Sequence, residues 1–306
     1  MSCQKNSISM WTVRFRLVML AVLAFLICGE YADLCAAEDV SFPSLDQALG
    51  KSEATVLRGL LFKPEGPGPF PAIIGLHGCG GMFGSGGKIM SRDAQWADFL
   101  SAHGFIVLLV DSFGSRGVGN VCAQRSPAVD PSRERPYDAY AALQYLRTLP
   151  LVHADRIGLL GWSQGGATVL FTIDSSAPAR PTVLPEGDFR AAVAFYPGWC
   201  DGKYHRSGWS SKIPLLVLIG EKDNWTQAAP CRYFLEHSRR DDTALTVVIY
   251  PDAFHDFDWP DLPLHAVTSV STRSGNPTTG TNPAASEDAH KRVLSYFERY
   301  LKPGSE

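Results

Sequence analysis

Short apolar runs separated by amphipathic segments of helix length constrain the fold of this chain more than any other feature. The runs are continuous and rich in β-branched residues, which is typical of strands buried on both faces of a parallel sheet. Their alternation with helices predicts a doubly wound α/β fold, with a mostly parallel sheet of about seven to eight strands. The expected strands cover residues 55–62, 71–76, 105–110, 156–160, 190–195, 214–219 and 245–250, and the expected helices cover 91–103, 137–149, 163–173, 226–239 and 287–301.

The N-terminus has the three parts of a secretory signal peptide. Basic residues precede the apolar run Leu17–Cys28, and Cys35-Ala36-Ala37 places small residues before a cut after Ala37. A run of twelve residues is too short to span a bilayer, so a membrane anchor is the weaker interpretation. We expect residues 1–37 to be removed and residues 38–306 to form a single domain. The mature protein is then secreted or periplasmic and carries no stable membrane anchor.

Export bears on the cysteines, because disulfides persist in oxidising compartments. Four of the seven cysteines follow residue 37, namely Cys79, Cys122, Cys200 and Cys231. We expect the pairs Cys79–Cys122 and Cys200–Cys231, because each pair lies on loops after neighbouring strands of the expected sheet. Four buried free thiols are the alternative.

The segment Gly161-Trp162-Ser163-Gln164-Gly165 matches the G-x-S-x-G pattern of a nucleophilic serine. Such a serine stands on a tight turn from a strand to a helix, where a Cβ two residues before or after it would meet neighbouring backbone. Residues 156–160 supply the strand and residues 167–173 supply the helix. A glycine-rich turn with a surface serine is the alternative.

A nucleophilic serine needs a base, and the base needs an acid that orients it. Asp223 and His255 each follow an expected strand, so both lie at the carboxyl ends of parallel strands, where ligands bind. The order Ser163, Asp223, His255 is the one that accompanies this serine motif. Alternative acids are Glu221, Asp252, Asp256 and Asp258, and alternative bases, less well placed in loops, are His205 and His265.

The loop His77–Gly81, of sequence HGCGG, follows the second expected strand. It is close to the HGGG-type loop whose backbone N–H groups stabilise the oxyanion of acyl transfer. We expect the Cys79 N–H, with Gly80 as the alternative, to be one donor of this oxyanion hole. The N–H of Gln164, directly after the serine, is the other. His77 is expected to be structural.

Charge and the remaining motifs argue against several classes of function. The formal net charge of -3 leaves no electrostatic footprint for nucleic acid. Residues 82–88 resemble a phosphate-binding loop only superficially, because they lack its first glycine and its final Ser or Thr. There is no H-E-x-x-H or C-x-x-C motif, so the sequence predicts neither a metal site nor a cofactor.

Taken together, the motifs resemble the dienelactone hydrolase family over nearly all of residues 38–306. The matching segments are HGCGG (77–81), VDSFGSRG (110–117), GWSQGG (161–166), GEKD (220–223) and FHDF (254–257). The resemblance implies an α/β-hydrolase fold without a cap domain that acts on small esters or lactones. Two positions depart from the family: Ser163 replaces its cysteine nucleophile, and Gly78 replaces a glutamate beside that nucleophile. General ester hydrolysis is therefore favoured over dienelactone hydrolysis.

We predict a carboxylic ester or lactone hydrolase that forms an acyl-enzyme and acts on a small-molecule substrate. An acyltransferase and a peptidase are the alternatives, and a non-catalytic binding protein is the weakest one. Arg116 either binds a substrate carboxylate with its bidentate fork or is structural. Trp199 lies in an aromatic-rich loop, residues 196–213, that either lines the substrate pocket or packs in the core. The long polar loop 258–286 receives no role from its sequence.

Overall fold

The computed structural model describes residues 37–124, 126–205, 208–238, 244–272, 275–302 and 304. The predicted signal peptide therefore lies outside the described residues, apart from Ala37. Within the described residues, no helix combines the length and the apolar character needed to cross a bilayer.

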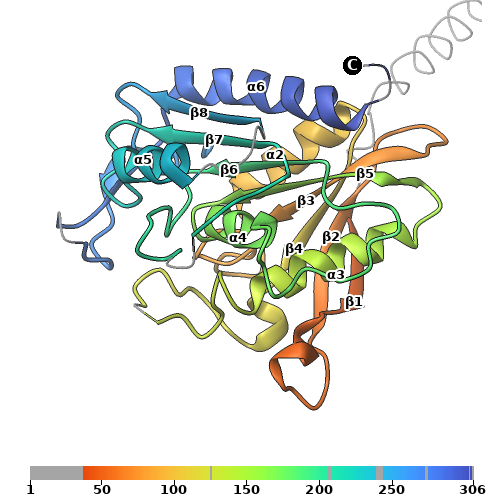
Figure 1. The fold of residues 1–306 in the computed structure, drawn as a ribbon. Coiled ribbons are helices and arrows are strands. Elements are labelled where there is room, and N and C mark those ends of the chain that lie inside the picture. The colour runs from red at the N-terminus through yellow and green to blue at the C-terminus, as the bar shows by residue number, and fades with distance from the viewer. Residues whose placement is uncertain are drawn as a thin grey trace, which may run out of the picture. The chain divides into compact units, whose positions relative to one another are not determined.

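Eight strands form one sheet in the order β1-β2-β4-β3-β5-β6-β7-β8 (Figure 1). The pairs β1–β2 and β2–β4 are antiparallel, and the other neighbours are parallel. The strands are β1 (Glu38–Pro43), β2 (Val56–Phe62), β3 (Phe70–Leu76), β4 (Ile106–Asp111), β5 (Val152–Trp162), β6 (Ala191–Phe195), β7 (Leu215–Gly220) and β8 (Leu245–Tyr250). A small second sheet pairs β9 (His265–Ala266) with β10 (Thr278–Thr279). The predicted doubly wound, mostly parallel α/β fold is confirmed.

Helices cover both faces of the large sheet (Figure 1). They are α2 (Ser91–Ala102), α3 (Arg135–Arg147), α4 (Gln164–Ile173), α5 (Ala228–Ser238) and α6 (Pro283–Leu301), with short 3₁₀ turns η1 (Asp46–Leu49) and η2 (Gly114–Arg116). On one face α2 contacts α6, where the Trp96 and His290 rings stack at 4.0 Å. On the other face α3 contacts α4, where the Tyr140 hydroxyl donates to the Thr172 carbonyl at 3.2 Å.

The C-terminal helix shows how the sequence determines this packing. Buried residues of α6 recur every four positions, which places them in one stripe along the helix. The stripe lies so close to β5 that a Cβ on Gly158 would come within 2.7 Å of Phe297. The helix begins at Pro283, four residues before the expected start, because the Asn282 side chain accepts a hydrogen bond from Ala285 N–H at 3.1 Å.

The first strand, β1, was not among the expected strands. Its sequence EDVSFP contains acidic and polar residues that are uncommon in strands. Only Val40 and Phe42 are buried, and they alternate with exposed residues as an edge strand with one covered face requires. Pairing with β2 therefore outweighs the weak local preference for a strand.

The register of the sheet brings the expected site loops to one edge. Leu76 at the end of β3 pairs with Gly161 near the end of β5, and Gly220 at the end of β7 pairs with Tyr250 at the end of β8. Loops that leave these four strands start at the same carboxyl edge, which is where ligands bind in doubly wound sheets.

Candidate active site

Ser163 forms the turn between β5 and α4 with φ 53° and ψ -110°. Bulky residues rarely adopt a positive φ, and such strain is characteristic of functional sites. The turn needs glycine on both sides. A Cβ on Gly161 would lie 2.4 Å from the Gly165 oxygen, and a Cβ on Gly165 would lie 2.0 Å from the Leu76 oxygen. The close approach of backbone therefore explains both glycines of the motif.

His255 lies between Ser163 and Asp223 in the structure. Its Nε2 is 3.0 Å from the Ser163 Oγ, and its Nδ1 is 2.7 Å from Asp223 Oδ2. Both partners come from loops that follow strands, and all three side chains are at most slightly exposed. The sequence separates these residues by up to 92 positions, and the sheet edge brings them together.

Thr226, which was not predicted from the sequence, supports this arrangement. Its hydroxyl lies 2.9 Å from Asp223 Oδ2 and 3.1 Å from His255 Nδ1. Asp223 Oδ1 accepts the backbone N–H groups of Trp225 and Thr226, each at 2.8 Å. An aspartate followed by a threonine three residues later is the sequence feature that could have predicted this turn. The two backbone donors hold Oδ1 away from the histidine, so that Oδ2 faces it.

Of the four alternative acids, Glu221 is exposed and the other three have other partners. Asp252 pairs with Lys222 on the surface. Asp256 accepts from Arg92 Nη1 at 3.3 Å and from the Thr279 hydroxyl. Among the hydrogen bonds between described residues, Asp223 provides the carboxylate partner of His255.

The environment of His255 determines its proton affinity. Complete burial alone would lower the pKa of the imidazole, but the charges of Asp223 and Asp256 outweigh burial, and the pKa is raised above 6.5. The rings of Tyr196 and Trp225 lie 4.5 Å and 4.8 Å from the imidazole. The site thus holds the histidine in place and stabilises its protonated form.

Asp258, the last of the alternative acids, is fully buried beneath the site and has a different role. It accepts the Tyr196 hydroxyl at 2.5 Å and the indole N–H groups of Trp96 and Trp162 at 2.8 Å and 2.9 Å. Burial raises the pKa of this carboxyl, against the charge of Arg92 and these donors. Asp258 therefore fixes the Tyr196 ring, which lies against His255, and two buried indoles.

The HGCGG loop lies directly over the turn that carries Ser163. His77 Nδ1 lies 2.7 Å from the Gly78 carbonyl oxygen, and its Nε2 accepts the Ser112 N–H at 3.3 Å. These contacts require a neutral imidazole, and burial lowers the pKa of His77 accordingly. Arg135, not identified from sequence, donates to the His77 carbonyl at 2.8 Å and to Gln164 Oε1 at 3.0 Å. One guanidinium thus ties the loop to the start of α4.

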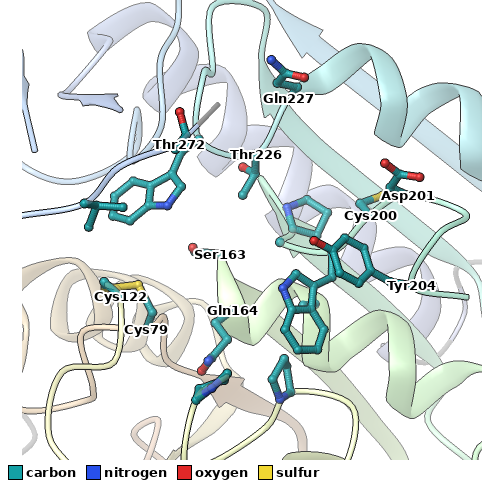
Figure 2. A pocket seen from close by; sticks show the side chains of 18 of the residues that line it. Cys79, Cys122, Ser163, Gln164, Cys200, Asp201, Tyr204, Thr226, Gln227 and Thr272 are labelled. Carbon is teal, nitrogen blue, oxygen red and sulfur yellow. A yellow bond between two sulfur atoms is a disulfide. The ribbon is translucent and has the colours of Figure 1, made fainter. Parts of the chain in front are cut away.

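Two disulfides flank the site, in the pairing that the sequence predicts. Cys79 in the HGCGG loop is bonded to Cys122, and Cys200 after β6 is bonded to Cys231 on α5. Figure 2 shows Ser163 with the first disulfide on one side and Cys200 on the other. Each bond joins segments that leave different strands, which restrains loops around the serine.

Ser163 lies between two cavities. The larger cavity, about 810 Å³, is bordered by residues that include Cys79, Gln164, Trp199, Tyr204, Trp225 and Thr272 (Figure 2). The smaller cavity, about 310 Å³, is bordered by residues that include Gly78, Cys79, Arg92, His255, Trp259 and His265. The long loop after β8, whose role the sequence did not indicate, borders both cavities. It contributes Trp259, Leu262, His265, Val267, Ser269 and Thr279 to the smaller cavity and Val270, Ser271 and Thr272 to the larger.

Of the two expected substrate-binding residues, the structure places Trp199 in the larger cavity wall and Arg116 elsewhere. Arg116 donates to both carboxylate oxygens of Asp138, at 2.9 Å and 2.7 Å, and to Asp46 at 2.9 Å. Its guanidinium is thus held by two buried carboxylates, and it borders neither cavity around Ser163. A substrate-binding role for Arg116 is not supported, and its structural role is the one that the contacts show.

The alternative histidines have other contacts in the structure. His205 is stacked between Phe171 and Phe234, at 4.4 Å and 4.7 Å, and burial lowers its pKa to about 4. His265 is exposed on β9 at the border of the smaller cavity. In the part of the chain that the structure describes, no cluster of three or more His, Cys, Asp or Glu side chains is arranged to hold a metal ion.

Comparison with known proteins identifies relatives along most of the chain. The profile of the dienelactone hydrolase family matches residues 57–301. Human mitochondrial acyl-coenzyme A thioesterase 2 is 26% identical over 289 residues, which cover 80% of this chain and 55% of that protein. For human acyl-coenzyme A thioesterase 1 the identity is also 26%, over 80% of this chain and 63% of that protein. The chain thus spans less than two thirds of the curated relatives it matches.

Solved structures show the same fold. A dienelactone hydrolase-like promiscuous phosphotriesterase from metagenomic libraries superposes with a TM-score of 0.63 at 20% identity, covering 87% of this chain and 99% of that one. A thermophilic esterase of Thermogutta terrifontis superposes with a TM-score of 0.56 at 16% identity, covering 90% and 96%. The profile match over most of the chain shows that this protein belongs to the dienelactone hydrolase family.

Proposed function

We propose that this protein hydrolyses carboxylic esters of small molecules through Ser163, His255 and Asp223. The observation that carries the proposal is the position of His255, which lies within hydrogen-bond distance of the Ser163 hydroxyl and of Asp223 at once. A serine hydroxyl is a weak nucleophile without a base, and this arrangement supplies the base in the required geometry. Membership of a hydrolase family supports ester hydrolysis in general.

The proposed reaction has two steps. His255 Nε2 takes the hydroxyl proton as Ser163 Oγ attacks the ester carbonyl carbon, and it returns the proton to the leaving alcohol oxygen as the ester bond breaks. His255 then takes a proton from the water that attacks the acyl-enzyme, and it returns this proton to Ser163 Oγ as the acyl bond breaks and the acid is released. Asp223 stabilises the imidazolium in both steps, and its fixed orientation keeps Nε2 directed at the serine.

Two backbone N–H groups are proposed to stabilise the oxyanion, those of Cys79 and Gln164. Gln164 is the first residue of α4, so its N–H is among those that a helix leaves without an intrahelical acceptor. Cys79 and Gln164 both border the larger cavity next to Ser163. The contacts of Arg135 to this loop and to this helix favour a fixed distance between the two donors.

The test compares Ser163→Ala with Ser176→Ala, a matched change of an exposed serine after α4. We expect Ser163→Ala to lower kcat for p-nitrophenyl esters by roughly 10⁴- to 10⁶-fold, and Ser176→Ala to leave it unchanged. A fluorophosphonate probe followed by peptide mass spectrometry should label Ser163 in the unsubstituted protein. Turnover that survives in Ser163→Ala, or a label on another residue, would show that the nucleophile is wrongly assigned.

Thioesters are a second candidate substrate class, because the curated relatives are acyl-coenzyme A thioesterases. The chemistry of attack is the same, and the leaving group is then a thiol. Presenting one acyl group as an oxygen ester and as a coenzyme A thioester separates the classes. A kcat/KM at least tenfold higher for the thioester would favour the second class.

We further propose that the protein is exported and cleaved after Ala37. A cut at that point leaves β1, which begins at Glu38, intact. The two disulfides fit an oxidising compartment. The mass of the protein recovered from the cell envelope fraction tests this, and a protein that retains residues 1–37 would contradict it.

A further inference from the structure

The two cavities beside Ser163 are not equivalent with respect to His255. His255 borders the smaller cavity and is not among the residues that border the larger one. Ser163 and Cys79 border both. The reacting carbonyl carbon, which must approach Ser163 Oγ, therefore lies where the two cavities meet.

This asymmetry determines which part of an ester enters which cavity. The leaving oxygen must receive its proton from His255 Nε2, so it lies on the side of the smaller cavity. In the tetrahedral intermediate the acyl substituent and the leaving oxygen extend in different directions from the reacting carbon. The alcohol part of the ester is thus directed to the smaller cavity of about 310 Å³, and the acyl part to the larger cavity of about 810 Å³.

Two stacked aromatic side chains, Trp199 and Tyr204, form one wall of the larger cavity, called the Trp199 wall below. The Trp199 and Tyr204 rings are stacked, with centroids 5.1 Å apart and an interplanar angle of 8°. Phe171 meets the indole edge-on at 6.2 Å. Trp199 itself has a φ of 53°, a conformation that is costly for a bulky side chain. The next residue, Cys200, is bonded to Cys231, which restrains this segment further.

The rest of the larger cavity's border contains both apolar and polar side chains, and the charged side chains among its described residues form one pair. Amide and hydroxyl side chains of Asn224, Gln227 and Thr272 contribute to it, and Figure 2 shows the latter two around the opening above Ser163. Its charged side chains Asp201 and Lys203 form an ion pair with each other at 2.9 Å. Flat aromatic groups stack on such a wall, while uncharged polar groups bind to amides and hydroxyls.

We propose that the substrate class is an ester that joins an aromatic acid bearing uncharged polar substituents, such as a phenolic acid, to an alcohol smaller than that acid. The aromatic ring of the acyl group packs against the Trp199 wall, and the alcohol occupies the smaller cavity. The inference rests on the proposed function, since it uses Ser163 as nucleophile and His255 as proton donor to the alcohol.

Two isomeric esters test the assignment, because they carry the same ring on opposite sides of the ester bond. One is the methyl ester of para-hydroxyphenylpropanoic acid, and the other is the acetate of para-hydroxyphenylethanol. We expect kcat/KM of the unsubstituted protein to be at least tenfold higher for the methyl ester. Trp199→Ala should reduce the ratio of the two values by about tenfold. Tyr233→Ala, an exposed aromatic residue on α5 outside the larger cavity, should not change the ratio.

A preference for the acetate isomer, or equal kcat/KM values for both, would overturn the assignment while leaving the serine hydrolase intact. The same holds if both isomers are inert while p-nitrophenyl acetate is turned over. If no ester of any kind is hydrolysed, the proposed function itself fails. The comparison in the unsubstituted protein decides the assignment even if Trp199→Ala does not fold, and Trp199→Phe then tests the ring by retaining it.

Discussion

Substitution of Gly165 by alanine tests whether the backbone of the turn at Ser163 is packed so closely against the HGCGG loop that a change in one displaces the other. Gly165 lies in the first turn of α4, and the end of β3 passes directly over it. A Cβ at this position would lie 2.0 Å from the Leu76 oxygen and 2.7 Å from the His77 oxygen. Both contacts are with backbone, so no side-chain rotation relieves them. The strand end, and with it the loop that carries Cys79, must move.

The size of the effect follows from these distances. Carbon and oxygen in contact need more than 3 Å of separation, so the 2.0 Å approach requires the backbone to shift by about 1 Å. Overpacking of this kind costs about 3 kcal/mol of folding free energy, which lowers Tm by roughly 6–12 °C in a chain of this size. A shift of 1 Å in an oxyanion donor costs about 100-fold in kcat.

Thermal unfolding followed by circular dichroism and steady-state ester hydrolysis measure the two effects. Gly119→Ala is the matched control, because a Cβ there meets nothing within 4 Å and its backbone is not in the left-handed region. We expect the control to change neither Tm nor kcat. A Gly165→Ala protein with the Tm and kcat of the unsubstituted protein would refute the close approach of β3 to α4.

Three further predictions concern the base, its support and the loop. In the proposed mechanism His255 acts as a base only when it is neutral, so its raised pKa means that kcat/KM falls as pH decreases through a value above 6.5. Asp223→Asn should lower kcat by about 10⁴-fold and move this limb to lower pH, which a pH–rate profile measures. Asp258→Ala leaves two indoles and a tyrosine hydroxyl without their acceptor and should cost about 3–5 kcal/mol in urea unfolding; an unchanged midpoint would contradict the network. Replacing Cys79 and Cys122 together by alanine should cost up to about 4 kcal/mol, the chain-entropy value for a separation of 43 residues, and should lower kcat as well; retention of full kcat would separate the disulfide from catalysis.

The sequence predicted those parts of the molecule that depend on local pattern and on strand order. Seven of the eight strands of the large sheet were expected, because buried parallel strands are continuous apolar runs that stand out from their surroundings. The loops that follow β5, β7 and β8 could then be assigned to one edge without knowing any distance. This is why Ser163, Asp223 and His255, far apart in the chain, were expected to lie close together, as they do in the structure.

The sequence did not predict side-chain contacts between residues that no motif or periodicity links. Arg116 carries the same guanidinium whether it meets a substrate carboxylate or Asp138, and only the fold brings α3 beside η2. Arg135 and Asp258 likewise bind partners that are distant in the sequence. Arg135 donates to Gln164, and Asp258 accepts from Trp96. Buried polar networks of this type are satisfied by three-dimensional neighbours, and neither periodicity nor a motif records them.

The two positions that depart from the family pattern, Ser163 and Gly78, are consistent with each other in this geometry. A hydroxyl loses its proton far less readily than a thiol, so a serine nucleophile depends on direct contact with a base. His255 provides that contact at 3.0 Å. A Cβ on Gly78 would lie 3.6 Å from the Ser163 Cβ, so any side chain there would begin against the nucleophile. Glycine leaves His255 without a competing acceptor from this position, which suits the proposed transfer of the Ser163 proton to the histidine.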